Sequence, residues 1–268
     1  PRPTGWLIDN VFEDLYYGFY SYEADDVVII GNEYKNNIVY GIDPHDRSRR
    51  LIIANNDSYG AKRKHGIIFS REVNDSWIFN NHSHHNQGSG IMLDRNCVGN
   101  VIANNQVDYN ENDGVVFIES PHNKSYANVI RNNGRSGVRI RNSWDITLMN
   151  DKILENNGYA MLVYQAELKD RDVQMDPYAM RSSFDVIGAE FSNNTAGNIN
   201  MMNIERAGFY NISVLKSPGG YFEGASSIKN LQSRMYDLSS FGQNGTEIYQ
   251  LNYVPKYSEF WDQSKQGQ

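Results

Sequence analysis

Short apolar strands recur along this chain at a nearly constant interval, and a glycine precedes most of them. These glycines are Gly18, Gly41, Gly66, Gly90, Gly114 and Gly137, and Ala160 takes the seventh place. Successive positions are 23, 25, 24, 24, 23 and 23 residues apart. After each glycine, apolar residues come at alternate positions, which turns them to one side of an extended strand. We predict that this side faces the core; its members are Ile42, Pro44, Ile67, Phe69, Ile91, Leu93, Val115, Phe117, Val138 and Ile140.

A second apolar strand lies upstream of most of these glycines and is followed by an asparagine. The asparagines are Asn32, Asn55, Asn80, Asn104, Asn128 and Asn150. Asparagine tolerates a left-handed backbone, and its amide can bond to its own copy in the next coil. Two or three short strands in each repeat of 23–25 residues predict an all-β, right-handed parallel β-helix. A leucine-rich horseshoe is the alternative, but its leucine spacing is absent.

The domain organisation follows from where the repeat holds. Residues 1–225 are predicted to form the β-helix, and residues 226–268 a C-terminal capping segment and tail. Within the first range, the polar residues 167–177 predict a loop that leaves the stack. Within the second, residues 227–238 have a weak helical pattern that would cap the coil, and residues 258–268 are typical of a poorly ordered terminus. The chain opens directly on a strand-like run, so we expect N-terminal coils of a longer protein to precede it.

Composition excludes several classes of protein. No apolar run approaches the length of a membrane span, and no signal peptide is recognisable at the start of the sequence. The formal net charge of −7 argues against a nucleic-acid partner. The single cysteine, Cys97, excludes an internal disulfide.

Charge is distributed unevenly. Between Asp43 and Arg71, seven basic residues stand against three acidic ones, a local balance of +4. The basic residues are Arg47, Arg49, Arg50, Lys62, Arg63, Lys64 and Arg71. A basic stripe on an acidic protein suggests a polyanionic ligand, and a solvated basic turn is an equally open interpretation.

The coil that begins at Gly41 departs from the repeat, because acidic residues and a histidine take its outward positions. Asp43 and His45 project from one face, and Arg71 follows on the next coil, about 4.8 Å along. His45 is the candidate base, since an imidazole titrates near neutrality, and Asp43 is the candidate to orient it or to raise its pKa. Arg71 offers a planar fork for a ligand carboxylate, and Tyr40 would approach a bound sugar from the other side.

A structural role is the alternative for the same residues. Asp43 and Asp46 would then pair with Arg47 and Arg71 to cap a bend. We favour catalysis, because a histidine, an acid, an arginine and a tyrosine seldom converge on one solenoid face for structural reasons alone.

Three segments make the family recognisable. Residues 40–48 (YGIDPHDRS) resemble the DPHD signature of mannuronan C5-epimerases. Residues 64–76 (KHGIIFSREVNDS) and 90–96 (GIMLDRN) are similar to the segments downstream of that signature in the periplasmic, alginate-biosynthesis branch. The resemblance extends through residues 139–143 and covers most of the chain.

The resemblance implies an isomerase that inverts C5 of β-D-mannuronate residues within the polymer to give α-L-guluronate, without a cofactor. It assigns the base to His45 and the carboxylate-neutralising role to Arg71. Asp43 and Asp46 belong to the same motif, and the secreted calcium-dependent branch also uses the tyrosine at the place of Tyr40. That branch carries an acid where Ser70 stands here, and its calcium-binding repeats are missing.

The reaction also requires a groove for a polyuronate chain. A bound arginine lowers the cost of a carbanion beside a carboxylate, and the opposite face then needs a proton from Tyr40 or from water. Candidate substrate-binding residues are Arg47, Lys62, Lys64, Ser70, Asp94, Arg95, Arg139 and Arg141. The cations among them are equally open to interpretation as solvated surface charges.

The remaining histidines predict no metal site. His82, His84 and His85 are expected on an exposed polar turn, without a carboxylate at ligand spacing, and His65 and His122 are expected to be structural. Two other functions stay open: a polyuronate lyase, which begins with the same proton abstraction, and a non-catalytic polysaccharide-binding β-helix. The family resemblance further implies a periplasmic location and membership of an alginate biosynthesis and secretion complex.

Overall fold

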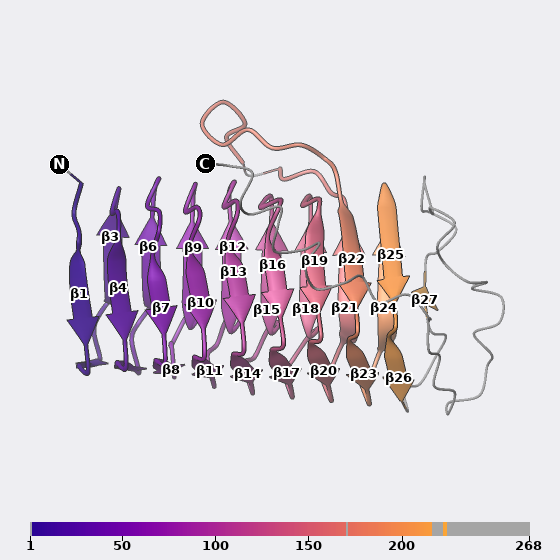
Figure 1. Cartoon of the computed structure of the whole chain (residues 1–268), viewed down its shortest axis with the longest axis horizontal. Helices are drawn as coiled ribbons and strands as arrows, with labels where there is room; N and C mark the ends of the chain where they lie inside the picture. Colours follow the sequence, from indigo (N-terminus) through magenta and orange to yellow (C-terminus); the bar gives the residue numbers. More distant parts are fainter. Residues whose placement is uncertain (1, 170, 216–221, 224–268) are drawn as a thin grey trace.

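A computed structural model describes residues 2–169, 171–215 and 222–223 of the chain. Within these ranges 27 strands form three parallel sheets of nine strands each (Figure 1). Each coil contributes one strand to each sheet, and the coils stack along the long axis of the molecule. The prediction of an all-β, parallel β-helix is confirmed. No helix that could cross a membrane is found in the part of the chain that the structure describes.

The first sheet contains the apolar strands predicted upstream of the glycines, and also a polar strand, β16, that the sequence pattern does not reveal. Its strands are β1 (Gly5–Ile8), β4 (Val27–Ile30), β7 (Ile52–Ala54), β10 (Trp77–Phe79), β13 (Val101–Ala103), β16 (Lys124–Tyr126), β19 (Ile146–Met149), β22 (Ser183–Ile187) and β25 (Arg206–Tyr210).

The second sheet is built from three-residue strands, most of which bury their middle residue. Its strands are β2 (Val11–Glu13), β5 (Glu33–Lys35), β8 (Asp57–Tyr59), β11 (His82–His84), β14 (Gln106–Asp108), β17 (Val129–Arg131), β20 (Lys152–Leu154), β23 (Glu190–Ser192) and β26 (Ser213–Leu215).

The third sheet contains the strands predicted after the glycines. Its strands are β3 (Tyr17–Tyr22), β6 (Tyr40–His45), β9 (Ile67–Ser70), β12 (Ile91–Asp94), β15 (Val115–Ile118), β18 (Val138–Arg141), β21 (Tyr159–Tyr164), β24 (Gly197–Met202) and β27 (Phe222–Glu223).

The core lies inside the coil, where the predicted inward residues are fully buried. Ile42, Ile67 and Phe69 have no exposed surface, and the same holds for their counterparts in later coils. The glycines are required because the second sheet packs against the start of each third-sheet strand. A β-carbon on Gly41 would lie 2.1 Å from Ser58 Oγ and 2.6 Å from the Gly66 carbonyl oxygen.

The asparagines have two separate roles, and their prediction as one column is wrong. Asn80 and its counterparts Asn55, Asn104 and Asn150 adopt φ angles of 53° to 56°, in the left-handed region. The residues that follow Asn80, Asn55 and Asn104 are also asparagines. They are buried and form a hydrogen-bond ladder between coils; they are Asn81, Asn56 and Asn105. The Asn81 side-chain oxygen accepts from the Asn56 backbone nitrogen at 3.0 Å, and the Asn81 backbone nitrogen donates to Asn105 Oδ1 at 2.9 Å. Asn32 and Asn128 belong to this ladder and not to the left-handed set.

A long connection joins β21 to β22, as the polar residues 167–177 predict. We call residues 165–182 the strap, of which residue 170 is not described. Figure 1 shows the strap leaving the stack between β21 and β22 and arching back over earlier coils. The predicted capping segment and tail, residues 226–268, lie outside the described residues.

Candidate functional site

A histidine, a carboxylate and a guanidinium form a continuous row on the outward face of the third sheet. His45 ends β6, and the following residue, Asp46, has a φ of 36°, which turns the chain at the strand end. His45 Nδ1 forms a short hydrogen bond to Asp46 Oδ2, and Arg71 Nη1 lies 3.3 Å from Asp46 Oδ1. When Nδ1 donates to Asp46, the lone pair of His45 is on Nε2, where a general base needs it. The imidazole and the guanidinium predicted from consecutive coils therefore meet at one carboxylate.

The orienting partner of His45 is Asp46, and the expectation that Asp43 has this role is wrong. The left-handed turn at Asp46 brings its carboxylate back onto the ring, which the alternation of strand residues does not reveal. The structural alternative is present in part, since Asp46 pairs with Arg71 while Asp43 pairs with neither Arg47 nor Arg71. Orientation by Asp46 and ion pairing to Arg71 are compatible with catalysis.

Asp43 is a buried carboxyl on the same strand as His45. The residue is 2% exposed, and its Oδ1 atom has no hydrogen-bond partner among the described residues. Burial raises the pKa of Asp43 to about 7, although a hydrogen bond with Ser70 and the charge of Arg95 oppose the shift. Asp43 can therefore hold or release a proton close to neutral pH.

Tyr40 lies in a column of stacked rings at the other end of β6. Its ring stacks on Tyr17 and on His65, with centroid distances of 5.8 Å to each. Burial raises the pKa of Tyr40 to about 12, and the charge of Asp43 adds to the effect. Tyr40 therefore keeps its phenolic proton, as a proton donor must. His65 is partly buried and accepts a hydrogen bond from the Ser89 backbone nitrogen, as a residue with a structural role would.

The strap supplies a second carboxylate to Arg71 that sequence reasoning missed. Asp176 Oδ1 lies 2.8 Å from Arg71 Nε, and Asp176 Oδ2 lies 2.8 Å from Arg71 Nη2. The hydrogen bond that Arg71 donates to Asp176 raises the pKa of the guanidinium, with Asp46 adding to the effect. The fork expected to bind a uronate carboxylate is therefore engaged by a carboxylate of the chain itself. In the sequence, Asp176 is one acid in a long polar segment. Nothing there indicates that it pairs with Arg71, which lies 105 residues away.

The strap is also fixed over later coils by Arg171. Its Nη2 atom lies 3.1 Å from Asp94 Oδ1 and 3.1 Å from Glu119 Oε2. Asp94 is paired with Arg95 as well, at 2.8 Å. Burial raises the pKa of Glu119 to about 7, and the positive charge of Arg171 opposes this.

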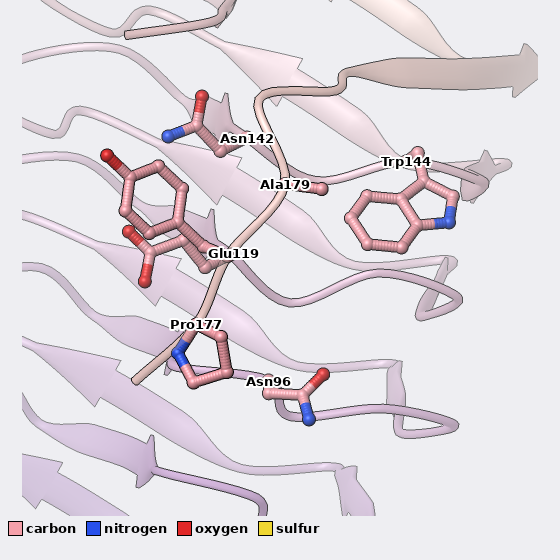
Figure 2. Close-up of a pocket in the computed structure, with 7 residues that line it drawn as sticks. Asn96, Glu119, Asn142, Trp144, Pro177 and Ala179 are labelled. Atoms are coloured by element: carbon pink, nitrogen blue, oxygen red, sulfur yellow. The ribbon is translucent and has the colours of Figure 1, made fainter. Parts of the chain in front are cut away.

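Two small hollows lie beneath the strap. One, of about 180 Å³, is lined by residues that include Arg71, Arg95 and Asp176. The other, of about 160 Å³, is shown in Figure 2, where the strap crosses the strand ends with Pro177 near Asn96 and Ala179 toward Trp144. His45 lines neither hollow. The strap therefore covers the side of Arg71 that faces later coils.

The predicted substrate-binding residues divide into two groups. Ser70, Asp94 and Arg95 lie beside the His45–Arg71 row: Ser70 is in register with both His45 and Asp94. The cations Lys62, Arg139 and Arg141 are engaged elsewhere, by Asp14 at 2.7 Å, by Asp113 at 3.2 Å and by the Glu167 carbonyl oxygen at 3.0 Å respectively.

The predicted basic stripe is largely neutralised by acids of preceding coils. Arg47 pairs with Glu23 at 2.5 Å, and Arg49 and Arg50 pair with Asp25 at 3.1 Å each. Lys64 is an exposed cation of this stripe. The stripe alone therefore does not define a polyanion site.

The prediction of an exposed polar turn holds for His85, which follows β11 at a φ of 52°, but not for His82 and His84. His82 and His84 lie on strand β11, and Asp57 of the preceding coil lies within ligand distance of both. The expectation that no carboxylate stands at ligand spacing is wrong, because the carboxylate comes from a stacked strand and not from a neighbouring sequence position.

The fold and the site together define a parallel β-helix with a histidine, a carboxylate and a guanidinium in contact on one outer face. The family model described as "Periplasmic copper-binding protein (NosD)" matches residues 4–133 and 96–176, and the chain belongs to this family.

Individual relatives of the chain are mannuronan C5-epimerases. The chain is 46% identical to the mannuronan C5-epimerase of Pseudomonas putida over 217 residues, which are 80% of this chain and 42% of that protein. It is 46% identical to mannuronan C5-epimerase AlgG of Azotobacter vinelandii over 243 residues, 89% of this chain and 46% of the relative. The crystal structure of the periplasmic alginate epimerase AlgG matches with a TM-score of 0.78 and 44% identity, over 80% of this chain and 51% of that one.

These matches confirm the resemblance to mannuronan C5-epimerases. The chain spans about half the length of the relatives that it matches.

Proposed function

We propose that this chain is the catalytic β-helix of an epimerase that acts on polymeric mannuronate. His45 removes the C5 proton, Arg71 neutralises the neighbouring carboxylate, and a proton returns to the opposite face to give α-L-guluronate. The observation that supports this most directly is the row His45–Asp46–Arg71, in which a base and a guanidinium meet on one face of the third sheet.

The chemistry requires both groups. A hydrogen beside a carboxylate is weakly acidic because the carbanion adds a second negative charge. A guanidinium bonded to that carboxylate stabilises the developing charge in a site shielded from water. Asp46 fixes the tautomer of His45, and Tyr40, with its retained proton, is the candidate for reprotonation together with water.

Substrate, location and partners follow from the same comparison. We propose that the substrate is the alginate polysaccharide, that the protein acts in the periplasm, and that it works within an alginate biosynthesis and secretion complex. The names of the relatives support the polysaccharide and the compartment.

The family description names copper, and one group of side chains among the described residues could bind such an ion. This set is Asp57, His82 and His84, and imidazole nitrogens suit copper. The set lies on the second sheet and the His45–Arg71 row on the third. A bound ion would supply a fixed positive charge there, and the proposed proton transfer uses only the chain's own residues.

The test is incubation of the protein with polymannuronate in heavy water. We expect deuterium at C5 and new guluronate signals in the proton NMR spectrum, with unchanged chain length. Unsaturated ends that absorb ultraviolet light would indicate a lyase, and neither signal would indicate a binding protein; both results would overturn the proposal.

His45→Ala is the decisive variant. We expect normal folding and loss of turnover by about 10²-fold or more, since a positioned general base contributes at least that factor. Arg71→Ala is expected to lose turnover and to bind polymannuronate more weakly. His122→Ala is the control, because His122 is exposed and pairs with Asp145 on another coil. Epimerisation retained by His45→Ala would exclude the assigned base.

A further inference from the structure

Two histidines and an aspartate converge on the outward face of the second sheet. The register pairs Asp57 of β8 with His82 of β11 and places His84 one pleat further along the same strand. Because alternate residues share a face, all three side chains point outward, while Ser58 and Ser83 between them are fully buried. The fold therefore brings the three groups together through stacking of coils.

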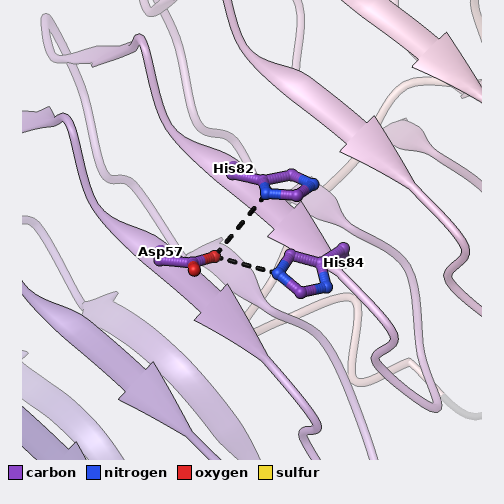
Figure 3. A group of neighbouring side chains, drawn as sticks. All are labelled: Asp57, His82 and His84. Carbon is purple, nitrogen blue, oxygen red and sulfur yellow. Dashed lines mark hydrogen bonds and ion pairs between the residues drawn. The ribbon is translucent and has the colours of Figure 1, made fainter.

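The distances between the three side chains suit a metal ion. Asp57 Oδ1 lies 3.0 Å from His84 Nε2 and 3.8 Å from His82 Nδ1. Figure 3 shows the Asp57 carboxylate facing both rings, with dashed lines for the two contacts. One ligand atom from each residue lies within 4.8 Å of the others. A tetrahedral ion with bonds of about 2.0–2.2 Å holds its ligand atoms about 3.3–3.6 Å apart. The two separations from Asp57 Oδ1 lie on either side of this value, within a few tenths of an ångström.

Each imidazole has its second nitrogen held by another residue. His82 Nε2 lies 2.8 Å from Asp108 Oδ1, and His84 Nδ1 lies 2.7 Å from His85 Nδ1. A hydrogen bond on the far nitrogen fixes the tautomer and orients the ring, and this is the usual environment of metal-bound histidine. The bond to Asp108 leaves His82 Nδ1 as the nitrogen with the lone pair, on the side of Asp57.

The rings are also held by stacking, and the cluster opens to solvent. The His82 and His84 rings have centroids 3.9 Å apart, and Tyr59 stacks on His84 at 4.9 Å. The His84 side chain is 16% exposed and that of Asp57 is 47% exposed. An ion can therefore enter from the Asp57 side, where water can complete its coordination.

We propose that Asp57, His82 and His84 form a binding site for a divalent first-row transition-metal ion. Two neutral imidazoles and one carboxylate suit Zn²⁺ or Cu²⁺, whereas Ca²⁺ and Mg²⁺ require more oxygen ligands than this site offers. Asp108 and His85 are positioning residues of the site, and the ion takes no part in the proposed epimerisation.

Binding is tested with the intact chain, after treatment with a chelator and gel filtration. Titration with Zn²⁺ followed by calorimetry is expected to show one tight equivalent. Cu²⁺ is expected to give an electron paramagnetic resonance spectrum with coupling to imidazole nitrogen, and excess Ca²⁺ should not displace either ion. These measurements do not depend on epimerase activity, so they can fail while the proposed function holds.

Variants locate the site. We expect His82→Ala and His84→Ala each to weaken Zn²⁺ binding by at least about tenfold, and Asp108→Asn to weaken it by about 10–100-fold through loss of ring orientation. His122→Ala is the matched control, because His122 faces a single carboxylate, Asp145, at 3.3 Å. Far-ultraviolet circular dichroism checks that each variant folds.

Two results would overturn the proposal. One is Zn²⁺ affinity that is unchanged in the conservative Asp57→Asn variant and in both folded histidine variants. The other is equal weakening by His122→Ala, since this would show diffuse binding to surface histidines and not a defined site.

Discussion

At the scale of single residues, the site depends on how the environment of each acid sets its role. Asp46, at the strand end, meets His45 and Arg71 and is held between them. Asp43, two residues before His45, is buried beside Ser70 and has its pKa raised to about 7, mainly by burial. Two carboxyl groups of one short motif therefore have different surroundings: Asp46 is held between His45 and Arg71, and Asp43 is buried beneath the same face.

The Asp43 pKa predicts a pH-dependent stability. Because the folded pKa is about 7 and the usual value is 3.8, the native state keeps a proton that the unfolded chain loses in this range. Stability from this group is fully present below about pH 4 and is lost as pH rises to about 7. Asp43→Asn removes this dependence. As pH rises from about 4 to about 7, we therefore expect the free energy of unfolding of the variant to increase relative to that of the wild type by roughly 2–4 kcal/mol. Urea unfolding at several pH values measures the difference.

Asp26→Asn provides a control with the opposite sign. The hydrogen bond from Arg50 lowers the pKa of Asp26, so this carboxylate stabilises the fold above its unfolded pKa and loses that effect in acid. A constant difference between wild type and Asp43→Asn at all pH values would contradict the assignment of a raised pKa to Asp43.

At the scale of elements, the strap and the asparagine ladder have different importance for function and stability. The strap places Asp176 on the Arg71 fork and Arg171 between Asp94 and Glu119. The ladder connects one coil to the next through buried side chains. The strap therefore occupies the arginine of the candidate site, and the ladder holds neighbouring coils of the stack together.

Removal of the strap carboxylate is expected to strengthen substrate binding. In Asp176→Ala, a uronate carboxylate no longer competes with Asp176 for Nε and Nη2 of Arg71. We expect KM for polymannuronate to fall by up to about tenfold, equivalent to about 1.4 kcal/mol. Steady-state kinetics followed by NMR gives the value. Glu167→Ala removes an exposed strap carboxylate as the control; a higher KM in Asp176→Ala would show instead that Asp176 positions Arg71 for its substrate.

The ladder predicts a contrast between neighbouring asparagines. The Asn81 amide donates to the Ile53 carbonyl oxygen at 2.9 Å and to Asn105 Oδ1 at 3.0 Å, and its oxygen accepts from Asn56. Asn81→Ala leaves these buried groups unpaired, and we expect a loss of about 2–4 kcal/mol in the free energy of unfolding. Asn80→Ala, at an exposed left-handed position, is expected to cost about 1 kcal/mol. Similar losses for both variants in urea unfolding would contradict the division of roles.

At the scale of the whole molecule, the coils form one continuous core from the first described coils to the strands after the strap. Each coil contacts mainly its two neighbours, so stability is close to a sum of coil and interface contributions. A side chain buried in the middle of the stack should therefore reach solvent only when several coils separate.

Cys97 tests this property. It is fully buried between β12 and β13, and burial raises the pKa of its thiol to about 12. We expect a disulfide reagent at pH 8 to find no reactive thiol in the native protein and one per chain in denaturant, since Cys97 is the only cysteine. The rate of labelling in partial denaturant should follow unfolding measured by circular dichroism. Rapid labelling without denaturant would show local opening of the stack.

The repeat and the principal catalytic candidates were predictable from the sequence alone. Period-two alternation and an interval of 23–25 residues determine which side chains enter the core, because backbone hydrogen bonding keeps stacked strands in register. The same register places Asp43 and His45 on one face and Arg71 one coil along at the strand edge, without knowledge of the loops. The family resemblance assigned the base to His45, in residues 40–48, and the carboxylate-neutralising role to Arg71, in residues 64–76.

Tertiary structure alone decided which groups meet across the coils. The carboxylate beside His45 is set by a left-handed turn, the acid on Arg71 comes from 105 residues away, and Asp57 reaches His82 and His84 from the preceding coil. Alternation along a strand specifies the side that a residue faces, and it carries no information about the path of a long loop or the rotamer of a charged side chain. These features depend on the folded stack, where short contact distances connect residues remote in sequence.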